Sequence, residues 1–179
     1  EAPQLAPDGD FLQFSVSRRL EDETQVLERY SFRRFVPSST YVQRFYPKDT
    51  QLHFGFSKTT AYHFDKTGRI TDSAKVEFMN RWDISQPIVF YLSADFPLHL
   101  VNTVDRVVKE WSLQIEAAGG RCVRWEKNSG QELGDLRYNL IAYDSTQSDS
   151  HGLMGYGPSF SNPRTGEIIK ADVVLYGGA

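Results

Sequence analysis

The sequence predicts an α+β fold, with a β-rich N-terminal region followed by a twisted mixed five-stranded sheet and one long crossover helix. Segments of residues 1–84 alternate apolar and polar side chains, and this period of two is typical of half-buried strands. Residues 85–179 change pattern, because they suggest one strand, one amphipathic helix and then four strands. We therefore expect two domains, residues 1–84 and residues 85–179.

The N-terminal region consists mostly of expected antiparallel strands. Its alternating segments are rich in aromatic and β-branched residues, which favour extended backbone. Turn sequences separate these segments, for example the Asp-Lys-Thr-Gly at 65–68. The expected strands cover residues 11–17, 30–35, 41–46, 52–56, 60–64 and 74–79.

A buried strand and a long helix open the second half. Residues 88–92 form a continuous apolar run, which is typical of a strand buried on both faces. Asp95 is the expected helix cap, Pro97 lies in the first turn, and Ala-Ala-Gly-Gly at 117–120 ends the helix. Helical spacing predicts that one apolar face packs on the core, formed by Leu100, Val104, Val107, Val108, Trp111 and Ile115.

Four further strands complete the expected sheet. They cover residues 122–125, 138–143, 152–161 and 167–176, and a turn at 162–166 joins the last two. The first strand–helix–strand unit is expected to be a parallel crossover, because such connections return to the same sheet.

Composition and charge exclude several functional classes. The 179 residues carry a net charge of −3 and no basic stripe, so we expect no nucleic-acid partner. The longest apolar runs are far shorter than the roughly 20 residues of a membrane span, so no transmembrane segment is expected. The single cysteine excludes an internal disulfide. The chain begins Glu-Ala-Pro-Gln, with no signal peptide, so we expect a processed or excised chain.

The sequence contains no self-contained catalytic constellation. Its histidines are His53, His63, His99 and His151, and none has the His-x-x-x-His spacing of a zinc helix. His53 and His63 could meet across a hairpin, and a loop between Asp144 and Asp149 could hold calcium, but both signals are weak. We therefore predict no catalytic and no metal-ligating residue in this chain.

One segment of the second half is more specific. The turn Asn162-Pro-Arg-Thr-Gly-Glu-Ile168 follows a glycine-rich strand and precedes a strand that starts Ala-Asp at 171–172. This order resembles the segment before the zinc helix in bacterial zinc-dependent metalloproteases of the metzincin type. Asn-Arg-Trp at 80–82 resembles the entry to that family's catalytic domain. Val-Val-Lys-Glu-Trp at 107–111 and Glu-Ala-Ala-Gly at 116–119 resemble its first helix.

The resemblance implies a zincin-like N-terminal catalytic subdomain in residues 85–179. The family's next element would be a helix with His-Glu-x-x-His, which supplies two zinc ligands and the general base. The chain ends before such a helix, so it is expected to be an inactive, zinc-free fragment of a zinc metallopeptidase. Zinc is expected in the full-length protein, with a peptide or protein as substrate. The family also implies a secreted, periplasmic or cell-envelope location.

One functional role transfers to residues of this chain. The family's antiparallel edge strand pairs with extended substrate, and the matching positions here are Gly155, Tyr156, Gly157, Pro158 and Ser159. The two glycines would let a peptide backbone approach, and Tyr156 would line a subsite. The alternative is that the glycines mark a bulge in an ordinary strand. Arg164 and Glu167 are expected to stabilise the turn.

Two other functional classes remain open at this point. One is a non-catalytic protein-binding module that keeps the sheet without a zinc helix. The other is a structural β-domain of a bacterial envelope or secreted protein, in which the motif match is coincidental. The residues that follow position 179 would discriminate between the peptidase and a binding module, since a nearby His-Glu-x-x-His would favour the peptidase and its absence would favour the module.

Overall fold

The fold is α+β, with one α-helix among the residues that the structure describes. A computed structural model describes residues 4–5, 9–34, 36, 38–47, 57–64, 67–68, 70–145 and 153–177. Its first five strands are β1 (Gln4–Leu5), β2 (Phe11–Arg19), β3 (Gln25–Arg33), β4 (Lys58–Phe64) and β5 (Ile70–Met79). The rest are β6 (Ile88–Leu92), a 3₁₀ turn (Leu98–Leu100), α1 (Val101–Ala117), β7 (Val123–Glu126), β8 (Asn139–Asp144), β9 (Gly155–Tyr156), β10 (Ser159–Ser161), β11 (Ile168–Ala171) and β12 (Val173–Tyr176).

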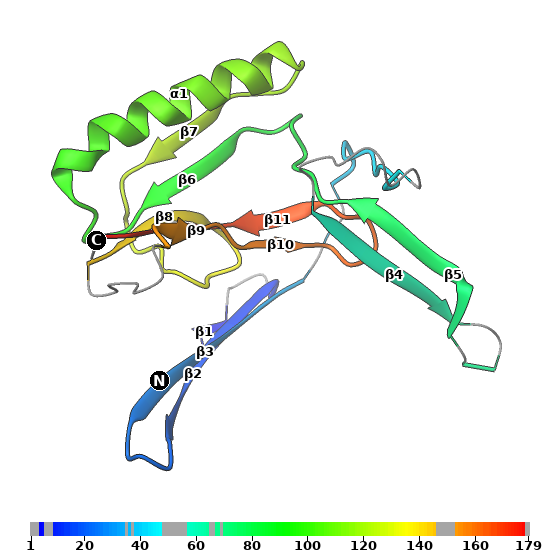
Figure 1. Ribbon diagram of the computed structural model, residues 1–179, viewed down its shortest axis with the longest axis horizontal. Coiled ribbons are helices and arrows are strands. Elements are labelled where there is room, and N and C mark those ends of the chain that lie inside the picture. Colours follow the sequence, from blue (N-terminus) through cyan, green and yellow to red (C-terminus); the bar gives the residue numbers. More distant parts are fainter. Residues whose placement is uncertain are drawn as a thin grey trace.

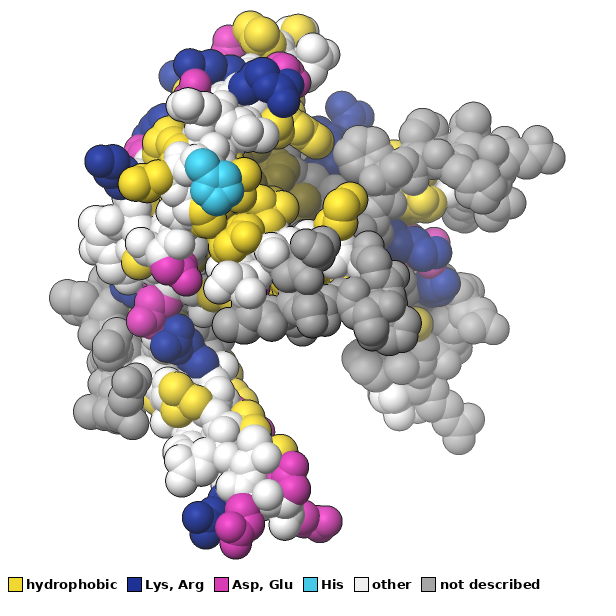
Figure 2. Space-filling view, turned by 60° about the vertical axis from the view of Figure 1, so that its left-hand side comes forward, with side chains coloured by type: hydrophobic (Ala, Val, Ile, Leu, Met, Phe, Trp, Pro, Cys, Tyr) yellow, Lys and Arg dark blue, Asp and Glu magenta, His cyan; other side chains and the backbone are white. Residues whose placement is uncertain are grey.

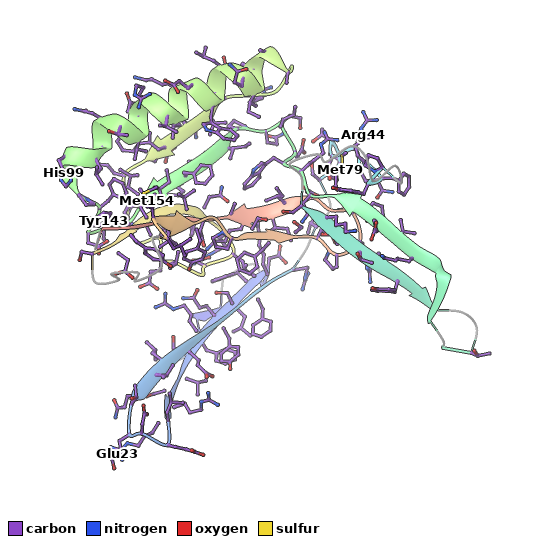
Figure 3. All side chains as sticks on the ribbon, in the orientation of Figure 1. Glu23, Arg44, Met79, His99, Tyr143 and Met154 are labelled. Carbon is purple, nitrogen blue, oxygen red and sulfur yellow. The ribbon has the colours of Figure 1, made fainter. Side chains whose placement is uncertain are left out.

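Two hairpins make up most of the N-terminal region (Figure 1). Strands β2 and β3 pair antiparallel along their whole length and point away from the rest of the molecule, with Glu23 at the tip (Figure 3). The Arg29 guanidinium reaches Glu132 at 2.8 Å, and that of Arg137 lies 3.8 Å from the centre of the Phe11 ring. The base of this hairpin is therefore fixed to the loop before β8. Strands β4 and β5 form the second hairpin.

The second half is built on a mixed five-stranded sheet with the order β7-β6-β8-β12-β9. Strands β7, β6, β8 and β12 run parallel to one another, while the last strand, β9, is antiparallel to β12. The parallel pairing of β6 and β7 through α1 confirms the expected crossover. Because β9 ends the order, it forms one edge of the sheet among the described strands.

The core lies between α1 and one face of this sheet. Val104 and Val108 of α1 are buried against Ile88, Val123 and Ile141. Their spacing of four places both valines on the same side of the helix, which is why the helical pattern predicted them correctly.

Strands β9 and β10 pair antiparallel with β12 and β11, respectively, and form one ribbon that is interrupted at Pro158. The pairs Tyr156–Val174 and Ser159–Ala171 share the same register, and the amide of Asp172 donates to the carbonyl of Pro158 at 2.9 Å between them. Proline has no amide hydrogen, so the ladder of hydrogen bonds is incomplete at that point. The expected strands at 152–161 and 167–176 are therefore each divided in two.

Two expectations from the sequence were wrong, and a third is not tested. Residues 41–46 form only an isolated bridge between Phe45 and Phe78, although Met79 donates to the Arg44 carbonyl beside it (Figure 3). Asp95 is not the helix cap, because Pro97 precedes a 3₁₀ turn and no described side chain caps it or α1. The expected strand at 52–56 falls outside the described residues.

A hydroxyl cluster around Asp83 joins the N-terminal region to the start of the sheet. The Asp83 carboxylate accepts hydrogen bonds from the hydroxyls of Ser38, Thr40 (2.6 Å) and Ser85 (2.7 Å), and from the Ser85 amide. Burial alone would raise the pKa of Asp83, but these hydrogen bonds outweigh it and lower the pKa to about 2. The ionised carboxylate is therefore stabilised in the folded protein.

We expect Asp83→Asn to lower the free energy of unfolding at pH 7 by about 1–2 kcal/mol, because three hydroxyls lose a charged acceptor. Since the folded pKa is depressed, this contribution is present above the unfolded pKa and is lost as the pH falls through about 2. Urea unfolding at pH 7 and at pH 2.5 checks both points. An equal loss at the two pH values would contradict the assignment to the charge.

Candidate functional site

The edge strand at Gly155–Ser159 directs alternate backbone groups away from the sheet. Tyr176 donates to the Met154 carbonyl and Asp172 donates to the Pro158 carbonyl, both at 2.9 Å. In an antiparallel ladder the hydrogen-bonded positions alternate, so the intervening residues direct their N–H and C=O groups outward. These outward residues are Gly155, Gly157 and Ser159.

The two glycines of this strand have different surroundings. A Cβ atom on Gly155 would lie 2.3 Å from the carbonyl oxygen of Val174, so glycine is needed for β9 to approach β12. A Cβ atom on Gly157 would have only an ordinary contact at 3.6 Å, with the Asp172 carbonyl. The absence of a side chain at Gly155 therefore has a packing reason within the sheet, whereas Gly157 is under no comparable constraint.

An apolar groove runs beside α1 on the core face of the sheet. It has a volume of ≈ 560 Å³, and Thr103 is the one non-hydrophobic residue among the described residues that line it. Val107 and Trp111 form its wall on α1, while Val173 and Leu175 form its floor on β12. Figure 2 shows hydrophobic side chains gathered below the helix, next to the histidine at its start. The helix thus covers β6 and β7, but leaves part of β8 and β12 open.

Trp111 corrects an expectation from the helical pattern. It was expected to pack in the core, but it is 63% exposed. The residue does lie on the apolar side of α1, at the flank that borders the groove. Sequence spacing identified the direction of the side chain, but it did not reveal that nothing among the described residues covers it. Trp82, by contrast, packs against Phe90 at 6.4 Å between ring centres.

The turn at 162–167 is a structural joint between the two halves. Asn162 is 3% exposed, and its side-chain oxygen accepts from the Arg164 amide at 2.9 Å. Arg81, just after β5, donates to the Gly166 carbonyl and accepts from the Ile168 amide. The most family-like motif of the sequence therefore serves packing in this structure, and the Arg164 side chain is exposed.

Glu167 in the same turn carries a partly buried carboxyl. Its Oε2 atom is buried and has no hydrogen-bond partner among the described residues. Burial raises the pKa of Glu167, with Asp83 raising it further, while a hydrogen bond from the Ser38 amide opposes the shift. Folding therefore makes the neutral form of this carboxyl more favourable than it is in the unfolded chain.

We expect Glu167→Gln to raise the free energy of unfolding at pH 7 by about 0.5 kcal/mol, a small gain because the side chain is only partly buried. Because the folded pKa is raised, the contribution of this carboxyl to wild-type stability is fully present below the unfolded pKa and is lost as the pH rises through the folded pKa. Thermal unfolding at pH 4 and pH 7 checks this, since the variant should gain only at pH 7. A loss at pH 7 that is absent or smaller at pH 4 would contradict the raised pKa, because it would mean that folding stabilises the ionised form.

The described residues offer no ready metal site. They contain no group of three or more His, Cys, Asp or Glu side chains that could hold an ion. His99 is exposed in the 3₁₀ turn before α1, while His53 and His151 lie outside the described residues. The loop that was considered for calcium is likewise described only as far as residue 145.

Comparison with known protein families, with curated proteins and with solved structures found no match for this chain. The candidate site therefore has to be judged on its geometry. Its two parts are an edge strand with outward backbone groups and an apolar groove on the opposite side of β12 from Tyr156. Among the described residues, no helix is long and apolar enough to cross a membrane.

Proposed function

We propose that this chain is the N-terminal part of a zinc-dependent peptidase of the metzincin type, and that its edge strand holds the peptide substrate. The observation that carries the proposal is the partly covered sheet. Four adjacent parallel strands end in an antiparallel edge strand, and the face under α1 remains partly open over β8 and β12. Parallel sheets are normally covered on both faces, so this face calls for a further apolar element.

A second amphipathic helix suits the groove in size and chemistry. Helices pack about 10 Å from a neighbouring helix, and two strands occupy about the same width. In the proposal this helix carries His-Glu-x-x-His, and it lies outside residues 1–179. The described residues themselves do not provide a zinc site, so we assign no catalytic step to them. Bound zinc would polarise the peptide carbonyl and activate water.

The role of the chain's own residues is to bind and align the substrate. An extended peptide would pair antiparallel with Gly155, Gly157 and Ser159, whose N–H and C=O groups point outward. Gly157 leaves room for the incoming backbone, because no close contact surrounds it. The free side chains of a peptide in this position would alternate between the α1 face and the Tyr156 face of the sheet.

Zinc content and peptidase activity of the full-length polypeptide test the proposal. We expect one zinc per full-length chain, protein hydrolysis that a chelator abolishes, and no zinc in residues 1–179. A full-length protein with neither zinc nor hydrolysis would refute the peptidase and favour a protein-binding module. Stoichiometric zinc in residues 1–179 would contradict the assignment of the ligands to a later segment.

A matched pair of variants on α1 tests the groove separately. Trp111 and Leu113 are both 63% exposed, but only Trp111 lines the groove. In the full-length protein, Trp111→Ala should lower stability by about 2 kcal/mol through lost burial, whereas Leu113→Ala should change it by less than about 0.5 kcal/mol. Equal effects would mean that no helix packs in the groove.

A further inference from the structure

We propose that the cavity beside β9 binds the side chain of a lysine or arginine in the substrate peptide, at the peptide residue that lies opposite Tyr156. This inference rests on the proposed pairing of a peptide with the edge strand. It adds a preference for a cationic side chain at one position.

The cavity lies on the face of the sheet away from α1 and has a volume of ≈ 380 Å³. Tyr156 on β9 and Tyr176 on β12 line it, with their ring centres 6.0 Å apart. Tyr143 of β8 also borders the cavity, but its ring packs against Phe96 on the α1 face, so the two rings of the cavity are those of Tyr156 and Tyr176. Aromatic faces attract cations through the quadrupole of the ring, at distances up to about 6 Å.

The charges around this cavity are negative. Asp95, which follows β6, and Asp144, at the end of β8, both line it. No Lys, Arg or His is among the described residues of the lining. The Ser93 hydroxyl, also in the wall, is buried and makes no hydrogen bond to a described residue. Aromatic rings, carboxylates and an unpaired hydroxyl together favour a polar cation over an apolar side chain.

The register of the edge strand places one peptide side chain over this cavity. Tyr156 pairs with Val174, and both residues line the cavity, so this is the face on which the Tyr156 ring lies. A peptide residue opposite Tyr156 would sit between the outward groups of Gly155 and Gly157, in a non-hydrogen-bonded pair. Side chains approach most closely in such pairs. The four-carbon stem of lysine can then cross the exposed Tyr156 ring toward Tyr176.

Peptide binding to residues 1–179 tests the inference. The probes are blocked seven-residue β-prone peptides that differ only at the centre, which carries lysine, arginine, norleucine or glutamate. We expect lysine and arginine to bind about three- to tenfold more tightly than norleucine, and glutamate to bind more weakly. The preference should shrink at high salt, because the carboxylates act through screened charge. NMR shifts of the Tyr156 ring report the binding site.

Variants of the cavity separate its two components. Tyr156→Phe keeps an aromatic face and should retain the preference, whereas Tyr156→Leu should lose most of it. Asp95→Asn combined with Asp144→Asn should reduce the preference for lysine without weakening the norleucine peptide.

The possible outcomes separate this inference from the proposed function. Equal binding of lysine and norleucine peptides would overturn the cation preference and leave edge pairing intact. Failure of every peptide to bind, or undiminished binding of a backbone N-methylated peptide, would overturn the edge pairing and the inference with it.

Discussion

Replacing Asp172 by alanine is expected to lower the free energy of unfolding by about 3–5 kcal/mol, because it leaves a buried charge without its counter-ion. Lys170 is 0% exposed and Asp172 is 3% exposed, and Nζ lies 3.0 Å from Oδ2. The other oxygen of Asp172 accepts from the Leu140 amide at 3.0 Å. Asp172→Ala would therefore leave both the ammonium group and a backbone amide unsatisfied.

The surroundings of Lys170 make this loss large. Its Nζ makes no hydrogen bond that satisfies normal geometry with a described residue, so the ion pair with Asp172 is its principal interaction. Transfer of an unpaired ammonium group from water into the interior is one of the most costly single changes in a protein. Ionic strength should have little influence on the effect, since buried pairs are weakly screened.

A double variant provides the control. Lys170→Met in the Asp172→Ala background removes the charge that the first change leaves unpaired, so part of the lost stability should return. Urea unfolding of the wild type, both single variants and the double variant gives the coupling between the two side chains. A loss below about 1 kcal/mol for Asp172→Ala alone would show that the ammonium group finds another partner or leaves the interior.

Gly166→Ala is expected to lower the free energy of unfolding by about 2–4 kcal/mol, for two separate reasons. Gly166 has a φ of +74°, a conformation that costs an L-residue about 1–2 kcal/mol. A Cβ atom there would also lie 2.5 Å from the Met79 carbonyl oxygen and 2.9 Å from the Phe78 Cβ. The clash falls on the joint between β5 and the turn at 162–167, so relief requires the two halves to separate.

Gly68 offers a matched control for this prediction. Its φ is +76°, nearly the same as that of Gly166, but nothing lies within 4 Å of a Cβ built on it. Gly68→Ala should therefore cost only the conformational part, about 1 kcal/mol. Thermal unfolding of the two variants separates strain from steric clash. Equal losses would mean that the contact with Met79 adds nothing.

Much of the fold could be predicted from local patterns. The strand at residues 88–92 has the boundaries that its apolar run predicts, and the helix ends at Ala117 before Gly119, which has a φ of +82°. These elements depend on nearest neighbours in the chain, namely period, propensity and a glycine stop. The expected strand at 41–46 was wrong, because alternation alone does not provide a partner strand, and only Phe45 forms a bridge there.

The candidate site was predicted less well than the fold. The sequence singled out residues 155–159, but not which of them direct backbone groups outward, because that depends on the register with β12. The cavity near Tyr156 was not predicted at all. Its lining comes from β8, β9 and β12, from the segment after β6 and from the loop before β8, and only pairing in the sheet brings these segments together.

The sequence by itself determined the kinds of elements, their order and the glycines at which the chain can turn, since these properties are local. Tertiary structure alone decided three further features: the exposure of Trp111 beside an apolar groove, the burial of Lys170 with Asp172, and the packing of Gly166 against Met79. Each depends on contacts between segments that are distant in sequence or on opposite layers. Burial, and with it the energetic value of a charge or a missing side chain, is set by such neighbours and not by the residue itself.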